Sequence, residues 1–376
     1  RSKEDEAFKE RAQNATFKLQ NGYRPYRAIW KHIMAVSLAD LKKNYASLNV
    51  DFDLWKGESD AQPYIPGLIE DLIGKGLAYE SQGALVVDIG EPGDTKELPP
   101  CIVRKSDGAA LYATSDLATI IEREKDFHPD RYIYIADKRQ DLHFTQVFRV
   151  AKKAGIVSKD QPMTFLGFGT MNGKDGKPFK TRDGGVMRLE NLIASIDEEV
   201  FKRIMENRTV SEEEARETAK IVGLAALKYG DLSNQAAKDY IFDIDRFISF
   251  EGNTGPYILY TIVRIKSIPN KYRENGGDAV HASILPPASE SEKGLVLQLM
   301  KYNEVMETSF AELAPHKICQ YIYELSNEFN RFYHDTKILS EEDKERQAGY
   351  VALITLTMAV LTACIGVLGI EAPERM

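Results

Sequence analysis

The pattern of apolar and polar positions divides the chain into two parts. From about residue 84 to residue 170, short apolar runs of strand length alternate with longer segments in which apolar residues recur every three or four positions. From about Leu189 onward the strand signal disappears, and helical patterns follow one another to the C-terminus. This order predicts an α/β part followed by an all-α part.

The first part opens with a helical pattern over residues 3–44, which Asn21, Gly22 and Pro25 interrupt. In the following GLIEDLIGKGLAYES, apolar residues recur at helical spacing, and Gly76 suits a helix C-terminus. The strands predicted after it are 84–90, 101–105, 110–115, 131–137 and 163–169, with helices over 116–127 and 141–155. Strands that alternate with helices of this length predict a parallel sheet with right-handed crossovers.

The second part has the pattern of a helical bundle. Ser211 and Glu214 form a capping box that opens a helix toward Tyr229. Three strong helical patterns then cover 293–310, 315–333 and 341–376, the last of them opening at Ser340-x-x-Asp343. Short connections between such helices are typical of a bundle that forms a separate domain.

One segment of this part is long and apolar enough to span a bilayer, because no charged residue lies between Arg346 and Glu371. A tail-anchored α/β protein is therefore one hypothesis. The segment also contains threonines and glycines, and no cluster of lysines or arginines follows it. Both features favour the other interpretation, a helix buried at the centre of the bundle.

Composition narrows the possible classes of protein. The 376 residues are enough for two or three domains, and the formal net charge is −8. Because that charge would repel a nucleic acid, any contact with one must be local. The three cysteines lie far apart, which indicates neither a zinc site nor a disulfide framework and suits a reducing cytosol.

A basic, glycine-rich loop, NGKDGKPFKTRDGG, follows the last predicted strand. It matches neither the Walker loop nor the G-x-G-x-x-G fingerprint. Lys180 and Arg182 within it are placed to neutralise phosphate charge that develops in a transition state, and its glycines would let it close on a substrate and open again. The alternative is the solvated tip of a hairpin.

The stretch LYATSD offers a candidate cation site. Tyr112 and Asp116 lie four residues apart across a predicted strand-to-helix junction, and a carboxylate accepts two parallel hydrogen bonds from a guanidinium. The alternative is that Ser115 or Asp116 only caps the following helix.

The stretch ADKRQDLHF follows the next predicted strand. Gln140 lies at the turn where the crevice of a parallel sheet opens. Asp141 is an alternative N-cap, and His143 is alternatively a histidine packed in the core. With the basic loop and Asp116, these side chains are predicted to face one crevice.

Five segments, in order, resemble arginyl-tRNA synthetase, a family of class I aminoacyl-tRNA synthetases. The first three are GALYATSDLA, DKRQDLHFTQVF and GFGTMNGKDGKPFKTRDGG, the last of which resembles the strand and signature loop equivalent to Lys-Met-Ser-Lys-Ser. The other two are YGDLSNQAAKDYIFDIDRFISFEGNTGPYILY and LGIEAPERM. Together they extend along nearly the whole chain.

The resemblance implies that Tyr112, Asp116 and Gln140 hold the substrate L-arginine. This agrees with the chemistry, since a fixed guanidinium needs a carboxylate and flanking acceptors. A site that must hydrogen-bond its substrate rejects analogues by ~10⁴-fold or more.

The resemblance also implies ATP as a substrate, accompanied by Mg²⁺. His143 lies near the ATP side of the family's site. Lys180 matches the second lysine of the signature loop, which stabilises the α-phosphate as pyrophosphate leaves, and Lys177 matches the first. No dedicated protein metal site is visible in the sequence.

In the bundle, Tyr257, Tyr260, Tyr333 and Met376 match positions that the family uses to stack the unwound anticodon bases of tRNA(Arg). Stacking on aromatic side chains is a general means of holding single-stranded RNA. The alternative for each tyrosine is ordinary half-buried packing.

The resemblance implies an α/β fold: a partial Rossmann-type nucleotide-binding domain with a parallel sheet, followed by an all-α helical-bundle anticodon-binding domain of the DALR type. We expect the catalytic part over residues 1–190, with an insertion near 1–100. A helical stem is expected over 191–252, and the bundle over 253–376. A cytoplasmic, monomeric protein without a membrane is expected.

The sequence departs from the family in one respect. None of the six histidines lies in the His-x-Gly-His segment that class I enzymes carry early in the nucleotide-binding fold. The first hypothesis is therefore a C-terminal portion of an arginine–tRNA ligase that lacks half of the ATP site and is incomplete for catalysis by itself. The other is a non-catalytic RNA-binding paralogue without the upstream half.

Overall fold

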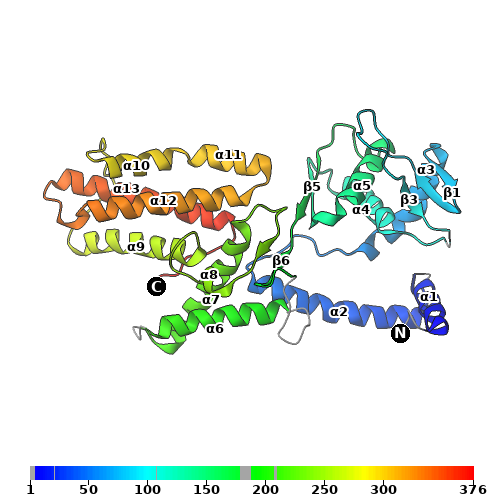
Figure 1. Ribbon diagram of the computed structural model, residues 1–376, viewed down its shortest axis with the longest axis horizontal. Coiled ribbons are helices and arrows are strands. Elements are labelled where there is room, and N and C mark those ends of the chain that lie inside the picture. Colours follow the sequence, from blue (N-terminus) through cyan, green and yellow to red (C-terminus); the bar gives the residue numbers. More distant parts are fainter. Residues whose placement is uncertain (1–4, 21, 107, 178–187, 207–209) are drawn as a thin grey trace.

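A computed structural model of the chain describes residues 5–20, 22–106, 108–177, 188–206 and 210–376. Figure 1 shows an α/β body at one end and a helical body at the other, with a long helix that extends from the first helix toward the helical body. Two separate clusters of buried side chains underlie these bodies: one draws on residues 61–157 and the other on residues 192–370.

The α/β body contains most of the strands. Helices α1 (Glu6–Gln20) and α2 (Arg24–Ser47) precede it and lie apart from it in Figure 1. Its elements are the 3₁₀ helix η1 (Glu58–Tyr64), α3 (Ile65–Gly74), β1 (Ala78–Ser81), β2 (Ala84–Val87), β3 (Cys101–Arg104), α4 (Tyr112–Asp126), β4 (Tyr132–Asp137), the 3₁₀ helix η2 (Lys138–Gln140), α5 (Asp141–Lys153), β5 (Met163–Phe168) and β6 (Met171–Asn172). Strands β1, β2 and β3 form an antiparallel sheet, whereas β4 and β5 pair in parallel along their full length.

The sequence predictions for this body are partly confirmed. The helix after Pro66 ends before Gly76, whose φ of 67° is the left-handed conformation that glycine adopts readily. The strands over 84–90, 101–105, 131–137 and 163–169 are present, but the first two of them, β2 and β3, pair antiparallel with each other and are not part of the parallel sheet. Among the described residues, parallel pairing is confined to β4–β5 and β6–β7.

The strand predicted over 110–115 is wrong, because α4 begins at Tyr112. The hydroxyl of Thr114 accepts a hydrogen bond from the Leu111 N–H at 3.3 Å and donates one to the carbonyl of Val103 at 2.7 Å. Such a bond at a helix start offers the backbone an alternative to a strand ladder. The alternating side chains of this segment therefore belong to the first turn of a helix.

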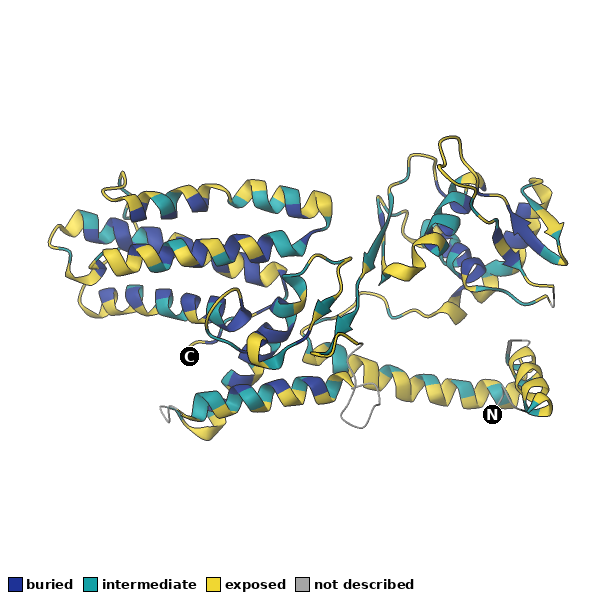
Figure 2. Ribbon diagram, in the orientation of Figure 1, coloured by how far each residue is buried: buried dark blue, intermediate teal, exposed yellow. Residues whose placement is uncertain are grey.

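The helical body completes the chain. Its elements are α6 (Leu189–Glu206), α7 (Glu212–Leu232), β7 (Tyr240–Ile241), α8 (Ile244–Phe247), α9 (Gly255–Glu274), α10 (Glu290–Met300), α11 (Tyr302–Glu312), α12 (Pro315–Asp335), the 3₁₀ helix η3 (Ile338–Ser340) and α13 (Lys344–Val367). Buried faces of α6 and α7 join the same cluster as those of the later helices, as the dark blue stripes in Figure 2 show.

Capping explains where two of these helices begin. The predicted cap at Ser211 is confirmed, since its hydroxyl accepts from the Glu214 N–H at 3.2 Å. The predicted start at Ser340 is wrong, because the carboxylate of Asp343 accepts from the N–H groups of the following residues and α13 begins there. The single helix predicted over 293–310 is divided at Lys301 into α10 and α11.

Helix α13 is the one helix in the described part of the chain that is long and apolar enough to cross a membrane. In the structure it contacts α9 and α12, and its side chains contribute to the buried cluster of the helical body. About half of its most apolar stretch, 44%, is buried inside the protein. Its packing is that of a core helix. By contrast, none of the described side chains of α2 is buried.

The carboxylate of Asp197 gives the contact between α6 and α7 a pH dependence. One of its oxygens is buried against Gly223 and has no hydrogen-bond partner among the described residues. Burial raises the pKa of Asp197 to about 6, although Lys220 partly opposes this. Because an unfolded chain releases that proton near pH 4, this group's contribution to stability is lost as the pH rises from about 4 to about 6.

We therefore expect Asp197→Asn to raise the free energy of unfolding at pH 7 by about 1 kcal/mol, because the amide has no charge that burial would disfavour. The gain should largely disappear near pH 4, where the carboxyl is protonated in the folded chain and about half protonated in the unfolded chain. Urea unfolding at both pH values measures this. A variant that is less stable than the parent at pH 7 would contradict the assignment.

Candidate functional site

Two of the predicted site residues meet between the N-terminal turns of α4 and α5. His143 Nε2 lies 2.6 Å from Asp116 Oδ2, and about a quarter of each side chain is exposed, 24% and 28% respectively. The other oxygen of Asp116, Oδ1, has no hydrogen-bond partner among the described residues. The carboxylate is thus held on one side and open on the other, which is the state that a cation-binding carboxylate requires.

An aromatic cluster forms the floor beneath this pair. The His143 ring meets Phe144 edge-on at 4.9 Å, and Phe144 stacks on Phe165 at 4.9 Å. Tyr134 lies 5.0 Å from Phe144, and burial raises the pKa of its phenol to about 12. The apolar floor lowers the local dielectric, so a charge–charge contact with Asp116 is stronger there than in water.

The remaining predicted arginine-site residues flank the pair. Tyr112 lies one helical turn before Asp116 on the same face of α4, and its side chain is 71% exposed. Gln140 is exposed and precedes α5 directly, three residues before His143. Two helix starts, from segments about 28 residues apart, therefore bring all four predicted side chains to one region.

Of the alternative interpretations of these residues, the two capping roles are wrong, whereas the packing of His143 is observed together with a second contact. The cap role for Ser115 or Asp116 is wrong, because α4 starts three residues earlier than Ser115. Asp141 is the first residue of α5 and not its N-cap. His143 does pack against Phe144, but it is also bonded to a carboxylate.

The base of the basic loop is tied to the helical body. Lys174 Nζ lies 3.0 Å from Asp243 Oδ1 and 3.5 Å from Asp245 Oδ2. Lys177 is exposed, and its carbonyl accepts a hydrogen bond from the Gly173 N–H at 2.7 Å, which closes a tight turn. Lys180 lies outside the described residues, as does Arg182, so the convergence of Lys180 and Asp116 on one ligand stays a prediction.

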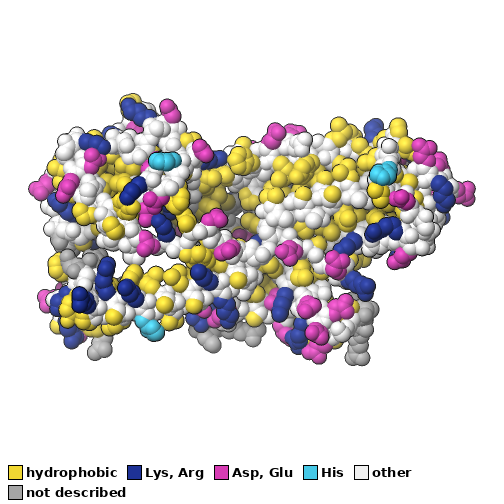
Figure 3. Space-filling view, turned by 180° about the vertical axis from the view of Figure 1, so that it is seen from behind, with side chains coloured by type: hydrophobic (Ala, Val, Ile, Leu, Met, Phe, Trp, Pro, Cys, Tyr) yellow, Lys and Arg dark blue, Asp and Glu magenta, His cyan; other side chains and the backbone are white. Residues whose placement is uncertain are grey.

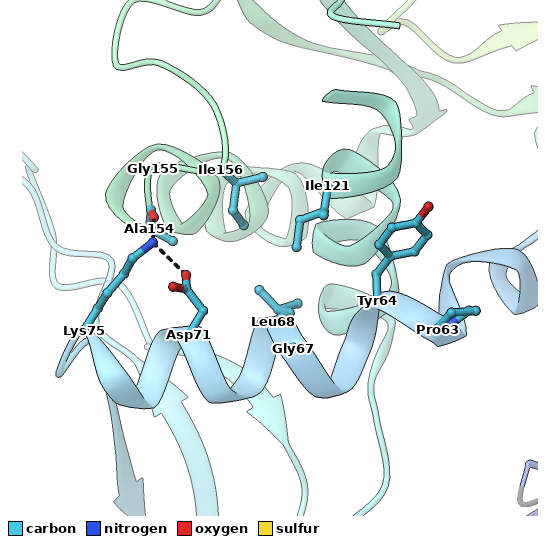
Figure 4. A pocket seen from close by; sticks show the side chains of 10 residues that line it. All are labelled: Pro63, Tyr64, Gly67, Leu68, Asp71, Lys75, Ile121, Ala154, Gly155 and Ile156. Carbon is cyan, nitrogen blue, oxygen red and sulfur yellow. Dashed lines mark hydrogen bonds and ion pairs between the residues drawn. The ribbon is translucent and has the colours of Figure 1, made fainter. Parts of the chain in front are cut away.

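A hollow of about 390 Å³ lies between α3 and the ends of α4 and α5 (Figure 4). Lys75 at one end donates to Asp71 at 2.7 Å and to the carbonyl of Ala154 at 2.6 Å. None of the predicted site residues lines this hollow. Within the described residues, no three His, Cys, Asp or Glu side chains gather as they would around a metal ion.

A second site region lies where α9 and α12 run side by side. The Arg264 guanidinium lies 4.6 Å above the ring of Tyr260 and 5.8 Å from that of Tyr333, and it donates to Asn330 at 3.0 Å. Both rings are about 40% exposed, 39% and 41%. An arginine held between two half-exposed tyrosines leaves flat aromatic surface available for stacking.

The other two residues predicted for RNA contact are more enclosed. The hydroxyl of Tyr257 donates to Asn327 at 2.7 Å and accepts from Asn330 at 2.9 Å, and its ring packs against Tyr323. Met376 is half-buried against the core of the helical body. Tyr257 thus shows the half-buried packing that was the alternative to a contact with RNA.

The sequence analysis did not single out Asn330 or its contact with Arg264. The signal was present as spacing: Tyr257, Tyr260 and Arg264 recur along one face of α9, as do Asn330 and Tyr333 on α12. On the face of the molecule shown in Figure 3, Lys and Arg side chains are interspersed with Asp and Glu over both bodies, whereas Lys and Arg prevail along the long helix at the lower left. This fits the expectation that any contact with RNA is local.

Family profiles match both bodies. The profile described as tRNA synthetases class I (R), catalytic domain, matches residues 1–244, and the DALR anticodon binding domain matches residues 258–376. The chain belongs to the arginyl class I tRNA synthetases. The resemblance drawn from five sequence segments is confirmed, and so is the order of a catalytic part with a parallel sheet and a helical anticodon-binding part. The domain boundaries at 190 and 252 stay predictions.

Curated relatives of this synthetase chain carry the name arginine–tRNA ligase. One from Agathobacter rectalis is 61% identical over 384 residues, and one from Alkaliphilus oremlandii is 56% identical over 375 residues. Each alignment covers 100% of this chain and 64% of the relative. The chain therefore spans a little under two thirds of the length of these relatives.

Solved structures show the same fold. Arginyl-tRNA synthetase from Plasmodium falciparum superimposes with a TM-score of 0.84 over 98% of this chain and 62% of that one, at 24% identity. The enzyme from Thermus thermophilus gives a TM-score of 0.78 over 96% of this chain and 68% of that one, at 21% identity. At these identities the likeness concerns the fold alone.

Proposed function

We propose that the chain is the larger part of an arginine–tRNA ligase, which joins L-arginine to tRNA(Arg) at the expense of ATP. One observation carries the proposal: Asp116 is fixed by His143 through one carboxylate oxygen, and its other oxygen has no hydrogen-bond partner among the described residues. A guanidinium needs such an anchored, open carboxylate. The whole enzyme would include the segment that contributes His-x-Gly-His.

The reaction proceeds in two steps. The carboxylate of arginine attacks the α-phosphorus of ATP, the bond to the β-phosphate breaks, and pyrophosphate leaves with its electron pair. A hydroxyl of the terminal ribose of the tRNA then attacks the activated carbonyl, loses its proton, and releases AMP. Both steps need reactants held in position and charge stabilised more than they need an acid or base from the protein.

Each candidate residue has one task in this scheme. Asp116 holds the guanidinium, Tyr112 and Gln140 limit its orientation, and His143 fixes the carboxylate on the side of the site that faces ATP. Lys177 and Lys180 of the signature loop counter the charge that grows on the phosphates. Mg²⁺, which binds ATP phosphates through their oxygens, would accompany ATP.

The direct test is arginine-dependent exchange of pyrophosphate into ATP by the chain joined to its upstream segment. We expect exchange that depends on arginine and ATP together, with tRNA(Arg) supplied in a parallel assay. A full-length wild-type protein that binds tRNA(Arg) but never supports exchange would instead be the non-catalytic paralogue.

We further propose that the bundle binds the anticodon bases of tRNA(Arg) and that the protein works as a cytoplasmic monomer without a membrane anchor. The packing of α13 within the bundle supports the absence of an anchor. Tyr260, Tyr333 and Arg264 form the stacking surface, with Tyr257 and Met376 beside it.

This surface makes a prediction about affinity. Tyr333→Ala should raise the Kd for tRNA(Arg) about tenfold or more, since stacking contributes about 1–3 kcal/mol per base. Tyr333→Phe should leave the Kd near the wild-type value. Tyr79, which is 45% exposed on β1, provides a matched control. Tyr79→Ala removes a similarly exposed ring from the α/β body, outside the proposed stacking surface. Filter binding measures all three, and an equal loss from Tyr333→Ala and Tyr79→Ala would refute the assignment.

A further inference from the structure

A short segment, residues 236–245, lies between the two bodies and contacts both. On one side it belongs to the helical body: the hydroxyl of Tyr240 donates to Asp231 of α7 at 2.6 Å, and Phe242 is buried against Phe247. On the other side its strand β7 pairs in parallel with β6, which leads into the basic loop. The segment is therefore fixed to the helices before it meets the catalytic part.

Asp239 is the charged group at this meeting point. Its Oδ1 accepts a hydrogen bond from Lys138 Nζ at 2.8 Å and another from the Thr170 N–H at 2.7 Å. These two contacts hold the pKa of Asp239 below its usual range. One carboxylate oxygen thus joins the turn after β4 to the stretch between β5 and β6.

Close backbone packing surrounds this carboxylate. The Gly169 N–H donates to the carbonyl of Ala236 at 2.8 Å, and a Cβ at Gly169 would collide with the backbone of Lys238. At Gly167 an added Cβ would lie 2.9 Å from Lys138 Cα. Small shifts of the segment would therefore be passed on to the two catalytic stretches, since tightly packed backbones do not deform smoothly.

Both stretches that Asp239 holds carry residues of the proposed site. Lys138 opens η2, which ends at Gln140, directly before the helix that presents His143. Thr170 precedes β6 and the start of the basic loop, where Lys174 is paired with Asp243 of the same segment. The arginine-binding turn and the base of the phosphate loop are thus attached to one short segment of the helical body.

We propose that Asp239 is a positioning residue for arginine activation: its carboxylate holds the turn that carries Gln140 and the base of the basic loop in one arrangement against the helical body. The inference rests on the proposed ligase function and deepens it. Through Asp239, the helical body, which is proposed to bind tRNA, directly contacts both the turn that carries Gln140 and the base of the basic loop.

The test uses the full-length enzyme with Asp239→Asn. We expect kcat/KM for arginine in pyrophosphate exchange to fall about tenfold, because small displacements of substrate-positioning groups cost that much or more. The Kd for tRNA(Arg) and the thermal midpoint should not change, since exposed ion pairs add little stability. Lys138→Met should reproduce the loss, and the double variant should be no worse than either single variant.

A matched control is available on α3. Asp71 pairs with Lys75 at 2.7 Å, with side-chain exposures of 45% and 46%, close to the 46% and 41% of Asp239 and Lys138. Asp71→Asn should leave every measured constant unchanged. Wild-type kcat/KM in Asp239→Asn, or a loss that accompanies a lower thermal midpoint, would overturn the proposal. A wild-type enzyme without arginine-dependent exchange would instead remove the ligase function itself.

Discussion

Replacing Asp116 by alanine in the full-length enzyme is expected to lower kcat/KM for arginine in pyrophosphate exchange by roughly 10⁴-fold. The variant removes the charge that a guanidinium needs and leaves the substrate cation unpaired in a partly buried site. The loss should concern arginine specifically, so KM for ATP and the thermal midpoint should stay near the wild-type values. Asp116→Asn, which keeps the shape and one acceptor, should lose less.

The role of His143 follows from the same contact. If the imidazole fixes the carboxylate, His143→Ala should raise KM for arginine and leave a functional but loosened site. Steady-state exchange kinetics with arginine as the varied substrate separate these outcomes. Near-wild-type constants in Asp116→Ala would mean that the guanidinium binds elsewhere and that the pair is merely structural.

The second large effect concerns stability. Gly255 begins α9 where this helix crosses α7, and a Cβ at this position would collide with the backbone carbonyl of Ala225. Two backbones in direct contact cannot give way as a flexible side chain can. Gly255→Ala should therefore lower the free energy of unfolding of the helical body by about 3 kcal/mol.

A second glycine provides the control. At Gly366 in α13, an added Cβ meets no atom within 4 Å. Gly366→Ala should stabilise the protein by about 0.5 kcal/mol, because alanine restricts the unfolded chain and favours the helix. Urea unfolding followed by circular dichroism compares the two. A Gly255→Ala variant as stable as the parent would show that the α7–α9 crossing is looser than the structure has it.

Some elements could be predicted from the sequence because their signals are local. Strands β4 and β5 consist mostly of apolar and aromatic residues, and the cap at Ser211 is a four-residue motif. The start of α4 could not be predicted, because its alternating side chains resemble a strand. What decides it is the bond from Thr114 to Val103, eleven residues away.

In the candidate site too, residues with a local signal could be predicted, whereas those that depend on long-range contacts could not. Asp116, Gln140 and His143 were recognised individually and were expected to face one crevice, and the starts of α4 and α5 bring Asp116 and His143 into contact. Asp239 lies in one of the five segments that resemble the family, but it was not singled out, since its segment has no periodicity. Its partners, Thr170 and Lys138, lie 69 and 101 residues away along the chain. Contacts of that range depend on the tertiary arrangement and not on local pattern.

The most direct test of the proposed arginine site is a crystal structure of the full-length enzyme with arginine bound. We predict a guanidinium nitrogen at about 2.7–2.9 Å from Asp116 Oδ1, the range of charge-assisted hydrogen bonds, with His143 still bonded to Oδ2. Arginine bound with its guanidinium away from Asp116, or with its carboxylate at that position, would contradict the proposed role of Asp116.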